Sequence, residues 1–475
     1  MRIAWLDEMS LIDRLLLVVM LCGVLGLSLG LTMAPWYFGC AAVVFIAVVL
    51  LIVRRPSFGV YVIAAALPFE RLGAYELGGV TIRLSQIMLF ATAVAWLIHQ
   101  VMDRPARLVR NPLLLPLSIF LAVNVMSLIN TPNLPRSIIV LAYITFTASL
   151  VFWIPNLITN TAQIKRLIAV MLISYVLVSA FGLFQFAGDM LGLPPEITGL
   201  RDLYTQDVLG FTRVQSTAYE PLYFANYLLL PIAIVFTFFL SQRSAMTGTV
   251  ALVLFGLGMV AFILTVSRGA YIAIAGMLMV IALFYLKRVL RPRLIVSFVL
   301  VGVIVGWIVL RALGAGGGLF TLEKFQEHVI NVFYGASFNE RVYTFEQASL
   351  AWQEDRLLGV GVGAFGPWVA PHPAYMPDDG WKIVNNEFIE ILAETGLLGL
   401  ISFLSLLVLL LIRTFRAIRI TRDGYLRAVL VASLAAVIGI IIQYQTFSTL
   451  YIMHVWFAIA FLVAAQNISM SDAHT

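Results

Sequence analysis

An arginine interrupts what is otherwise a continuous apolar hairpin. Arg268, in the segment TVSRGAY, stands between two long apolar runs, where basic residues are otherwise sparse. A charged side chain there costs free energy unless it snorkels to a membrane interface, pairs with an acid or binds an anion. A guanidinium is always charged and can grip phosphate oxygens with two parallel donors. We therefore interpret Arg268 as either a snorkelling loop residue or part of an anion-binding site.

A second group of charged residues precedes another apolar run. Arg201 and Arg213 lie in the segment 189–221, which ends in Glu220 and Pro221. Proline suits the first turn of a helix, and an acid beside it is favoured by the helix dipole. Glu220 is therefore either a helix-start carboxylate or a group that orients or deprotonates a substrate hydroxyl.

The segment FNERVYTFEQASLAWQE, 338–354, has the spacing of an amphipathic helix. Its apolar residues recur near one face, and charges occupy the other. Arg341 begins this helix and is either a solvated surface charge or a second cation for the anion site. The residues expected on the apolar face are Val342, Phe345, Ala348 and Trp352.

A glycine-rich stretch and a proline-rich stretch follow. GVGVGAF, with Gly359, Gly361 and Gly363, lacks the strand and the lysine of a nucleotide-binding loop, so it predicts a turn or close backbone packing. His372 comes shortly before Asp378 and Asp379, but the proline-rich surroundings favour solvated loop residues over a metal site. No metal site and no cofactor is predicted.

Three glutamates share one face of the segment NNEFIEILAETGLLGL, 385–400. Asn385 and Asn386 can cap the first turn of that helix, where the dipole also favours Glu387. Counting about 20 residues for a bilayer crossing places Glu387 and Glu390 outside it, lining the outer mouth. Glu394, at the boundary, most needs a partner, for which we expect Arg268 or Arg341.

The elements that position these residues belong in a bilayer. The chain is 61% hydrophobic and 11% charged, and its mean hydropathy is +0.99. A soluble domain of this length does not have that balance. The two cysteines, Cys22 and Cys40, lie in apolar runs, which predicts core residues and excludes a disulfide framework. The first apolar run is expected to be a retained span, because it is too long for a cleaved signal peptide.

The apolar runs predict an all-α polytopic membrane protein with 12 to 14 transmembrane helices. The third run is short and contains Pro68, which leaves the count open. The expected spans are 15–34, 36–53, 57–69, 84–102, 113–130, 137–156, 167–188, 222–241, 247–266, 269–286, 294–313, 391–412, 425–445 and 450–465.

The positive charges predict how the chain is oriented. With the N-terminus inside, most of the 30 Lys and Arg residues fall in the inner loops, whereas most of the 24 acids fall in the outer ones. Both termini are therefore predicted to be cytoplasmic, and the net charge of +6 reflects topology, not a nucleic-acid surface. The expected organisation is N-terminal spans in 1–188, an outer loop in 189–221, central spans in 222–313, a large helical outer loop in 314–385 and C-terminal spans in 386–475.

Together these motifs resemble the O-antigen ligase and polymerase superfamily of bacterial membrane glycosyltransferases. The matching parts are TVSRGAY, then RVYTFEQASLAWQEDRLLGVGVGAF, and last NNEFIEILAETGLLGL. The resemblance is specific for residues 267–400; elsewhere it rests on the number of spans and the placement of the loops.

The resemblance implies a C-type, metal-independent, inverting glycosyltransferase in the bacterial inner membrane. Its donor would be an undecaprenyl-diphosphate-linked oligosaccharide, bound at the periplasmic face within the bilayer, with polysaccharide export or chain-length proteins as candidate partners. Arg268 and Arg341 carry over as catalytic residues. Arg201, Arg213, His372 and Asn386 are added as substrate-binding candidates.

One position departs from the family pattern. The ligases have a histidine before the asparagine of the last motif, and Asn385 stands there in this chain. Asparagine cannot act as a general base. Either the base lies elsewhere, with Glu220, Glu387 and His372 as candidates, or the diphosphate is a good enough leaving group that the acceptor needs mainly positioning. Asn385 stays among the candidate catalytic residues. The change favours a repeat-unit polymerase over a ligase that transfers glycan to lipid A core.

Two alternatives belong to other classes of protein. A small-anion transporter, for instance of bicarbonate, should have ionisable residues along a path through the bilayer, whereas here the charges gather in outer loops and at span ends. A non-catalytic scaffold is favoured only by Gly396 and Gly399, whose spacing suits close helix packing.

Overall fold

The computed structural model describes residues 36–71, 75–77, 80–102, 108–243, 246–292, 336–377, 380–448 and 450–472, with isolated positions between 293 and 306. The expected span 15–34 therefore lies outside the described residues, and so does almost all of the expected span 294–313. So do Cys22, Asp378, Asp379 and the first part of the large outer loop. Of Cys40, only the backbone is described.

The described chain is helical apart from one hairpin. In the first half, the elements are α3 (Trp36–Arg54), α4 (Pro56–Ala66), β1 (Tyr75–Leu77), β2 (Val80–Ile82), α5 (Leu84–Met102), α6 (Leu114–Ser127), η1 (Leu128–Asn130), α7 (Leu134–Ala148), α8 (Leu150–Leu157), α9 (Thr161–Met190), α10 (Pro195–Thr198), η2 (Asp202–Tyr204) and α11 (Gln206–Leu209). The two strands pair antiparallel, with Glu76 opposite Thr81.

The second half begins with α12 (Pro221–Ser241), α13 (Gly248–Ile263), α14 (Arg268–Phe284) and α15 (Leu286–Val289). It continues with α18 (Ala336–Glu354), α19 (Phe365–Val369), α20 (Glu387–Ile420), α21 (Gly424–Gln443) and α22 (Met453–Asp472).

Seven of the described helices are long and apolar enough to cross a membrane, and five more are shorter apolar helices. They occupy every expected span except 15–34 and 294–313, so the prediction of an all-α polytopic membrane protein is confirmed. The expected span 137–156 is divided into α7 and α8 at Ser149, and Pro155 lies inside α8. Elsewhere, asparagine side chains begin helices: Asn160 accepts a hydrogen bond from the Gln163 amide at the start of α9.

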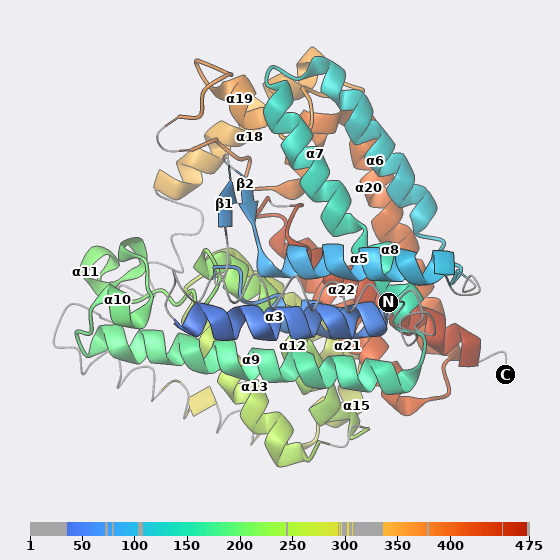
Figure 1. The fold of residues 1–475 in the computed structure, drawn as a ribbon. Helices are drawn as coiled ribbons and strands as arrows, with labels where there is room; N and C mark the ends of the chain where they lie inside the picture. Colours follow the sequence, from blue (N-terminus) through green and yellow to red (C-terminus); the bar gives the residue numbers. More distant parts are fainter. Residues whose placement is uncertain are drawn as a thin grey trace, which may run out of the picture.

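The core of the bundle is formed by α12 and α22. In their most apolar stretches, 94% and 89% of the residues are buried, compared with 33% for α5. Helix α21 packs against α12, α14 and α22. In Figure 1, α3, α5 and α9 run in one direction at the periphery, and α6, α7 and α20 cross them at a steep angle. The helices of the two long loops, α10 with α11 and α18 with α19, lie on the same side of the molecule, away from the C-terminus (Figure 1).

The amphipathic helix of the large loop is α18, as expected, and its buried face agrees in part with the expected one. Ala348 is buried and Phe345 packs against the same cluster, as expected, whereas Val342 is 40% exposed. Ala351, which the apolar pattern did not single out, is also buried. Trp352 lies at the edge and donates from its indole to the Arg356 carbonyl.

The glycine-rich stretch provides close backbone packing, as expected. Helix α20 is interrupted at Gly396, whose φ of 64° and ψ of −165° are not helical. The backbone of the glycine-rich stretch pairs with this break: the Val360 amide donates to the Ala393 carbonyl at 3.0 Å and the Gly361 amide to the Glu394 carbonyl at 2.8 Å. Gly396 therefore packs against this loop, and not against a neighbouring helix as its spacing to Gly399 suggested.

Candidate functional site

Three arginines from three distant segments interact at one end of the bundle. Arg213 lies in the loop before α12, Arg268 is the first residue of α14, and Arg341 lies in α18. Burial lowers the pKa of Arg341, and the charge of Arg268 lowers it further. Burial also lowers the pKa of Arg213, and Arg268 acts in the same direction. Arg268 thus lies within electrostatic range of both Arg213 and Arg341.

Backbone hydrogen bonds hold the Arg213 segment beside Arg268. The Val214 amide donates to the Leu264 carbonyl at 2.9 Å, next to the turn between α13 and α14. Arg213 Nε reaches the Thr265 carbonyl at 3.5 Å in the same turn. On the other side, the Ser216 amide donates to Gln185 Oε1 of α9 at 2.7 Å. The Arg213 segment is therefore held by a backbone carbonyl at the end of α13 and by a side chain of α9, as well as by the contact of the arginine itself.

The backbone has positive φ values at Ser216 and Val266, close in the chain to Arg213 and Arg268. These φ values are 52° and 48°; of the other described non-glycine residues, Gln242 and Asn385 also have positive φ values, of 53° and 60°. Left-handed backbone is uncommon for residues other than glycine and an outlier for a β-branched one such as Val266. Such strain costs of order 1–3 kcal/mol per residue, persists only where the surroundings impose it, and clusters at functional sites. Val266 lies two residues before Arg268, so this strain helps to aim the first turn of α14.

Arg201 joins the cluster at its exposed edge. The guanidinium of Arg201 lies 5.8 Å from the centre of the Tyr204 ring, and that of Arg213 lies 5.6 Å from the same ring. Arg201 also donates from Nη1 to the Tyr219 carbonyl at 3.3 Å. Tyr204 therefore holds two of the predicted substrate-binding arginines around one aromatic face.

Glu220 faces these arginines. It occupies the N-cap position of α12, but its side chain makes no capping hydrogen bond. Burial raises the pKa of Glu220, against the lowering effect of the Arg201 and Arg213 charges. The helix-start interpretation thus accounts for its position in the chain, whereas its carboxylate interacts with the cations of the site.

Sequence reasoning missed a buried polar chain beside Glu220. Glu70 and His454 are 7% and 6% exposed, and Glu70 Oε1 lies 3.6 Å from His454 Nδ1. The other ring nitrogen of His454 lies 2.8 Å from Asn226 Oδ1, and Asn226 donates in turn to Gln443 Oε1 at 2.8 Å. Because the Asn226 oxygen must accept, His454 Nε2 carries a proton and its Nδ1 faces the carboxylate.

Glu70 is ionised in this arrangement. Burial alone would raise its pKa, but the hydrogen bond with His454 and the charge of Arg83 outweigh burial and lower it. The pair could have been found by searching for ionisable residues at the ends of apolar runs. The charge of Glu70 also raises the pKa of Glu220.

The three glutamates of α20 line a separate cavity of about 50 Å³, together with Arg136, Ser448 and Tyr451. Their position on one helix face is as expected, but the expected environment is wrong for Glu387, which is only 3% exposed. Its amide donates to the Tyr444 carbonyl at 2.9 Å, which draws the first turn of α20 into the bundle.

The expected partners of Glu394 are also wrong. Its carboxylate accepts from the Gly363 and Phe365 amides at 2.7 and 3.1 Å, and the cation that interacts with it is Arg136. Arg136 itself donates from Nε to the Gly363 carbonyl at 2.8 Å. The reason is the break at Gly396, which lets the glycine-rich loop wrap around this turn of α20 and satisfy the carboxylate.

The remaining predicted site residues have varied surroundings. Asn386 caps α20, because its Oδ1 accepts from the Phe388 and Ile389 amides at 3.1 Å. Its Nδ2 donates to Gln445, so its side chain is used within the protein. Asn385 is half-buried. His372 is exposed, and its carbonyl closes a turn with the Tyr375 amide. Within the described ranges, no group of three or more acidic, histidine or cysteine side chains is placed to hold a metal ion.

Gly269 gives a test of how Arg268 is positioned. A Cβ at Gly269 would overlap the side chain of Thr446, in the turn after α21. We expect Gly269→Ala to push the first turn of α14 away and to lower any activity that depends on Arg268 about 10- to 100-fold, since misplacing a functional group by about 1 Å has effects of this size. Removing the obstacle in the double variant Gly269→Ala/Thr446→Gly should restore most of the rate. Equal rates for the single variant and the unaltered protein would show that this contact does not position Arg268.

Residues 250–404 match the model of a family described as O-antigen ligase. The matched region contains Arg268, Arg341 and the glutamates of α20, but not Arg213, Glu220, Glu70 or His454. It confirms the resemblance seen in the sequence motifs. Among curated proteins, none matches the chain.

Proposed function

We propose that this chain is a glycosyltransferase of the bacterial inner membrane that acts on undecaprenyl-diphosphate-linked glycans at the periplasmic face. The match to the O-antigen ligase family supports a membrane protein that processes glycans. It gives no support to the transporter alternative. Within the proposed class, we favour a polymerase of polysaccharide repeat units, with ligation to lipid A core as the second candidate.

The observation that carries the proposal is the convergence of Arg213, Arg268 and Arg341. Like charges repel, so three arginines held within interaction range by separate segments are suited to bind an anion of high charge density. A lipid diphosphate has that property, and its negative charge grows when it leaves the sugar. Cations already in place stabilise this charge without having to reorganise.

In the proposed reaction, a hydroxyl of the acceptor sugar attacks the anomeric carbon of the donor. A bond forms between that oxygen and the anomeric carbon, and the bond from the anomeric carbon to the diphosphate oxygen breaks with inversion. Glu220 takes the hydroxyl proton, and the arginines hold the departing lipid diphosphate. Glu220 is preferred over His372, which is exposed, and over Glu387, which is almost fully buried.

The role of Glu220 predicts a pH dependence. Burial raises its pKa, so the carboxylate takes up a proton at a higher pH than an ordinary glutamate does. A base must be ionised to act, and activity should therefore fall as the pH drops through this raised pKa. We expect Glu220→Gln to lower the rate about 10²- to 10⁴-fold at neutral pH and to remove this acid limb.

The control for this profile is Glu340→Gln, which removes an exposed acid that pairs with Lys382 at 3.1 Å. The measurement is the rate of glycan transfer by purified protein between pH 4 and 8. If the fall in activity at low pH is unchanged in Glu220→Gln, a group other than Glu220 accepts the hydroxyl proton.

Deletion of the gene tests the class of reaction. Under the proposal, lipid-linked single repeat units accumulate and surface polymer is lost. If polymer still forms but stays on its lipid carrier, the chain is a ligase. If the deletion changes neither the amount of lipid-linked repeat units nor the amount of lipid-linked polymer, the proposed function is wrong.

A further inference from the structure

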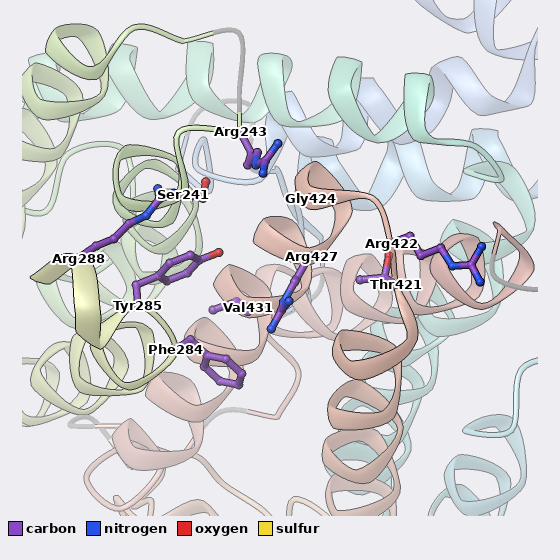
Figure 2. Close-up of a pocket in the computed structure, with 10 residues that line it drawn as sticks. All are labelled: Ser241, Arg243, Phe284, Tyr285, Arg288, Thr421, Arg422, Gly424, Arg427 and Val431. Atoms are coloured by element: carbon purple, nitrogen blue, oxygen red, sulfur yellow. The ribbon is translucent and has the colours of Figure 1, made fainter.

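A basic pocket lies at the opposite end of α14 from Arg268, on the predicted cytoplasmic side. It has a volume of about 360 Å³ and lies between the ends of α12 and α14 and the turn from α20 to α21. Figure 2 shows Arg243, Arg288 and Arg427 around it, from three different segments, with the Tyr285 hydroxyl between them. A fourth arginine, Arg422, extends away from the other three (Figure 2).

The packing around the pocket fixes these arginines. Arg288 donates from Nη1 to the Leu240 carbonyl at the end of α12. Arg243 lies directly over Gly424, where a Cβ would come within 3.1 Å of its Nε. Burial raises the pKa of Tyr285, and the charges of Arg427 and Arg288 lower it, so both cations are near its hydroxyl.

The described residues that line the pocket include no acid. The nearest one in the chain, Asp423, caps α21 through a hydrogen bond from the Tyr425 amide at 2.7 Å. The positive charge is therefore not neutralised by the side chains that form the pocket. The N-terminus of α21 adds to it, because the dipole of this helix is positive at Gly424.

An apolar groove of about 540 Å³ adjoins the basic pocket and shares Arg288 with it. Its other lining residues are mostly apolar (Phe239, Leu240, Gly248, Pro292 and Leu294), with Gln242 and Arg291 as further polar members. A free inorganic anion would use only the basic pocket. Arginines that serve merely to orient the chain in the membrane would not need to converge beside an apolar groove.

We propose that the basic pocket binds the phosphate group of an anionic phospholipid of the inner leaflet, with one acyl chain in the adjoining groove. Charge complementarity identifies the head group, and the groove identifies a lipid over a free phosphate. Basic pockets between transmembrane helices on the cytoplasmic side are known to bind such head groups. The bound lipid would tie the end of α14 to the start of α21.

Binding is measured with the purified full-length protein in a neutral detergent, by native mass spectrometry and by thermal unfolding. We expect phosphatidylglycerol and cardiolipin to bind and to raise the melting temperature, and phosphatidylcholine to do so much less. The double variant Arg288→Gln/Arg427→Gln should weaken this binding about tenfold or more, since it removes two of the cations that surround the head group. The matched control Arg416→Gln/Arg419→Gln removes two exposed charges at the same end and should bind normally.

A variant of the groove separates a lipid from a free anion. A Cβ at Gly248 meets nothing within 4 Å, so Gly248→Phe can be accommodated and places its ring in the groove. We expect it to weaken phosphatidylglycerol binding with all arginines intact. Stabilisation by inorganic phosphate or glycerol phosphate equal to that by the lipid would overturn the proposal, as would equal lipid binding by the pocket and control variants. If the double variant fails to fold, Arg243→Gln and Gly248→Phe provide the same comparison.

Discussion

Replacing Arg268 with alanine is expected to lower the rate of glycan transfer about 10²- to 10³-fold, the usual effect of removing one preorganised group that stabilises transition-state charge. Arg268 is the middle cation of the cluster, since it interacts with both Arg213 and Arg341. The measurement is polymer formed by purified protein from an undecaprenyl-diphosphate-linked repeat unit. Binding of the donor should be reduced less than the rate, because the charge on the leaving diphosphate grows in the transition state.

The neighbouring arginines extend this test. Arg213→Ala and Arg341→Ala should each have a large effect, and the double variant should lose less than the product of the two, because the cations act as a unit. Arg201→Ala should have a smaller effect, since Arg201 is exposed. Arg268→Lys should keep part of the activity, because it retains the charge but not the paired donors. The control is Arg416→Ala, which removes an exposed arginine near the C-terminal end of α20. A normal rate of glycan transfer in Arg268→Ala would exclude the proposed site.

Replacing Gly396 with alanine is expected to destabilise the protein by about 2–5 kcal/mol. Its φ of 64° and ψ of −165° belong to a region of backbone space that is open essentially only to glycine. A Cβ there would also overlap the backbone carbonyl of Leu357. That backbone belongs to the loop that continues into the glycine-rich stretch and binds Glu394, so the break in α20 and the cavity beside it should be lost together.

The measurement is the yield of folded protein in the membrane and its thermal unfolding after purification. Gly256→Ala is the matched control, because Gly256 lies within α13 and a Cβ there meets nothing within 4 Å. Alanine is the better helix former, so this variant should be neutral or slightly more stable. If Gly396→Ala unfolds at the same temperature as Gly256→Ala, the break in α20 is not required for folding.

The spans could be predicted because a bilayer imposes a length and an apolar composition on each helix separately. The exposure of Val342 in α18 could not be predicted, because α18 is not among the helices apolar enough to cross a membrane and its burial depends on the helices it packs against. Val342 fits an apolar pattern as well as Ala348 does, yet only Ala348 faces α19 and α20. The same limit explains Glu387, whose burial depends on the Tyr444 carbonyl of another helix.

By itself, the sequence determined the membrane class, the positions of most spans, the family motifs and the arginines of the candidate site. These features follow from local composition and residue type. An arginine between two apolar spans, for example, costs free energy and therefore marks a candidate functional site. The tertiary structure alone decided that Arg213 and Arg341 lie within electrostatic range of Arg268. It also decided that Glu394 interacts with Arg136 and backbone amides, and that Glu70 pairs with His454. Each of these contacts joins residues far apart in the chain, and their pairing depends on how helices pack and where α20 breaks.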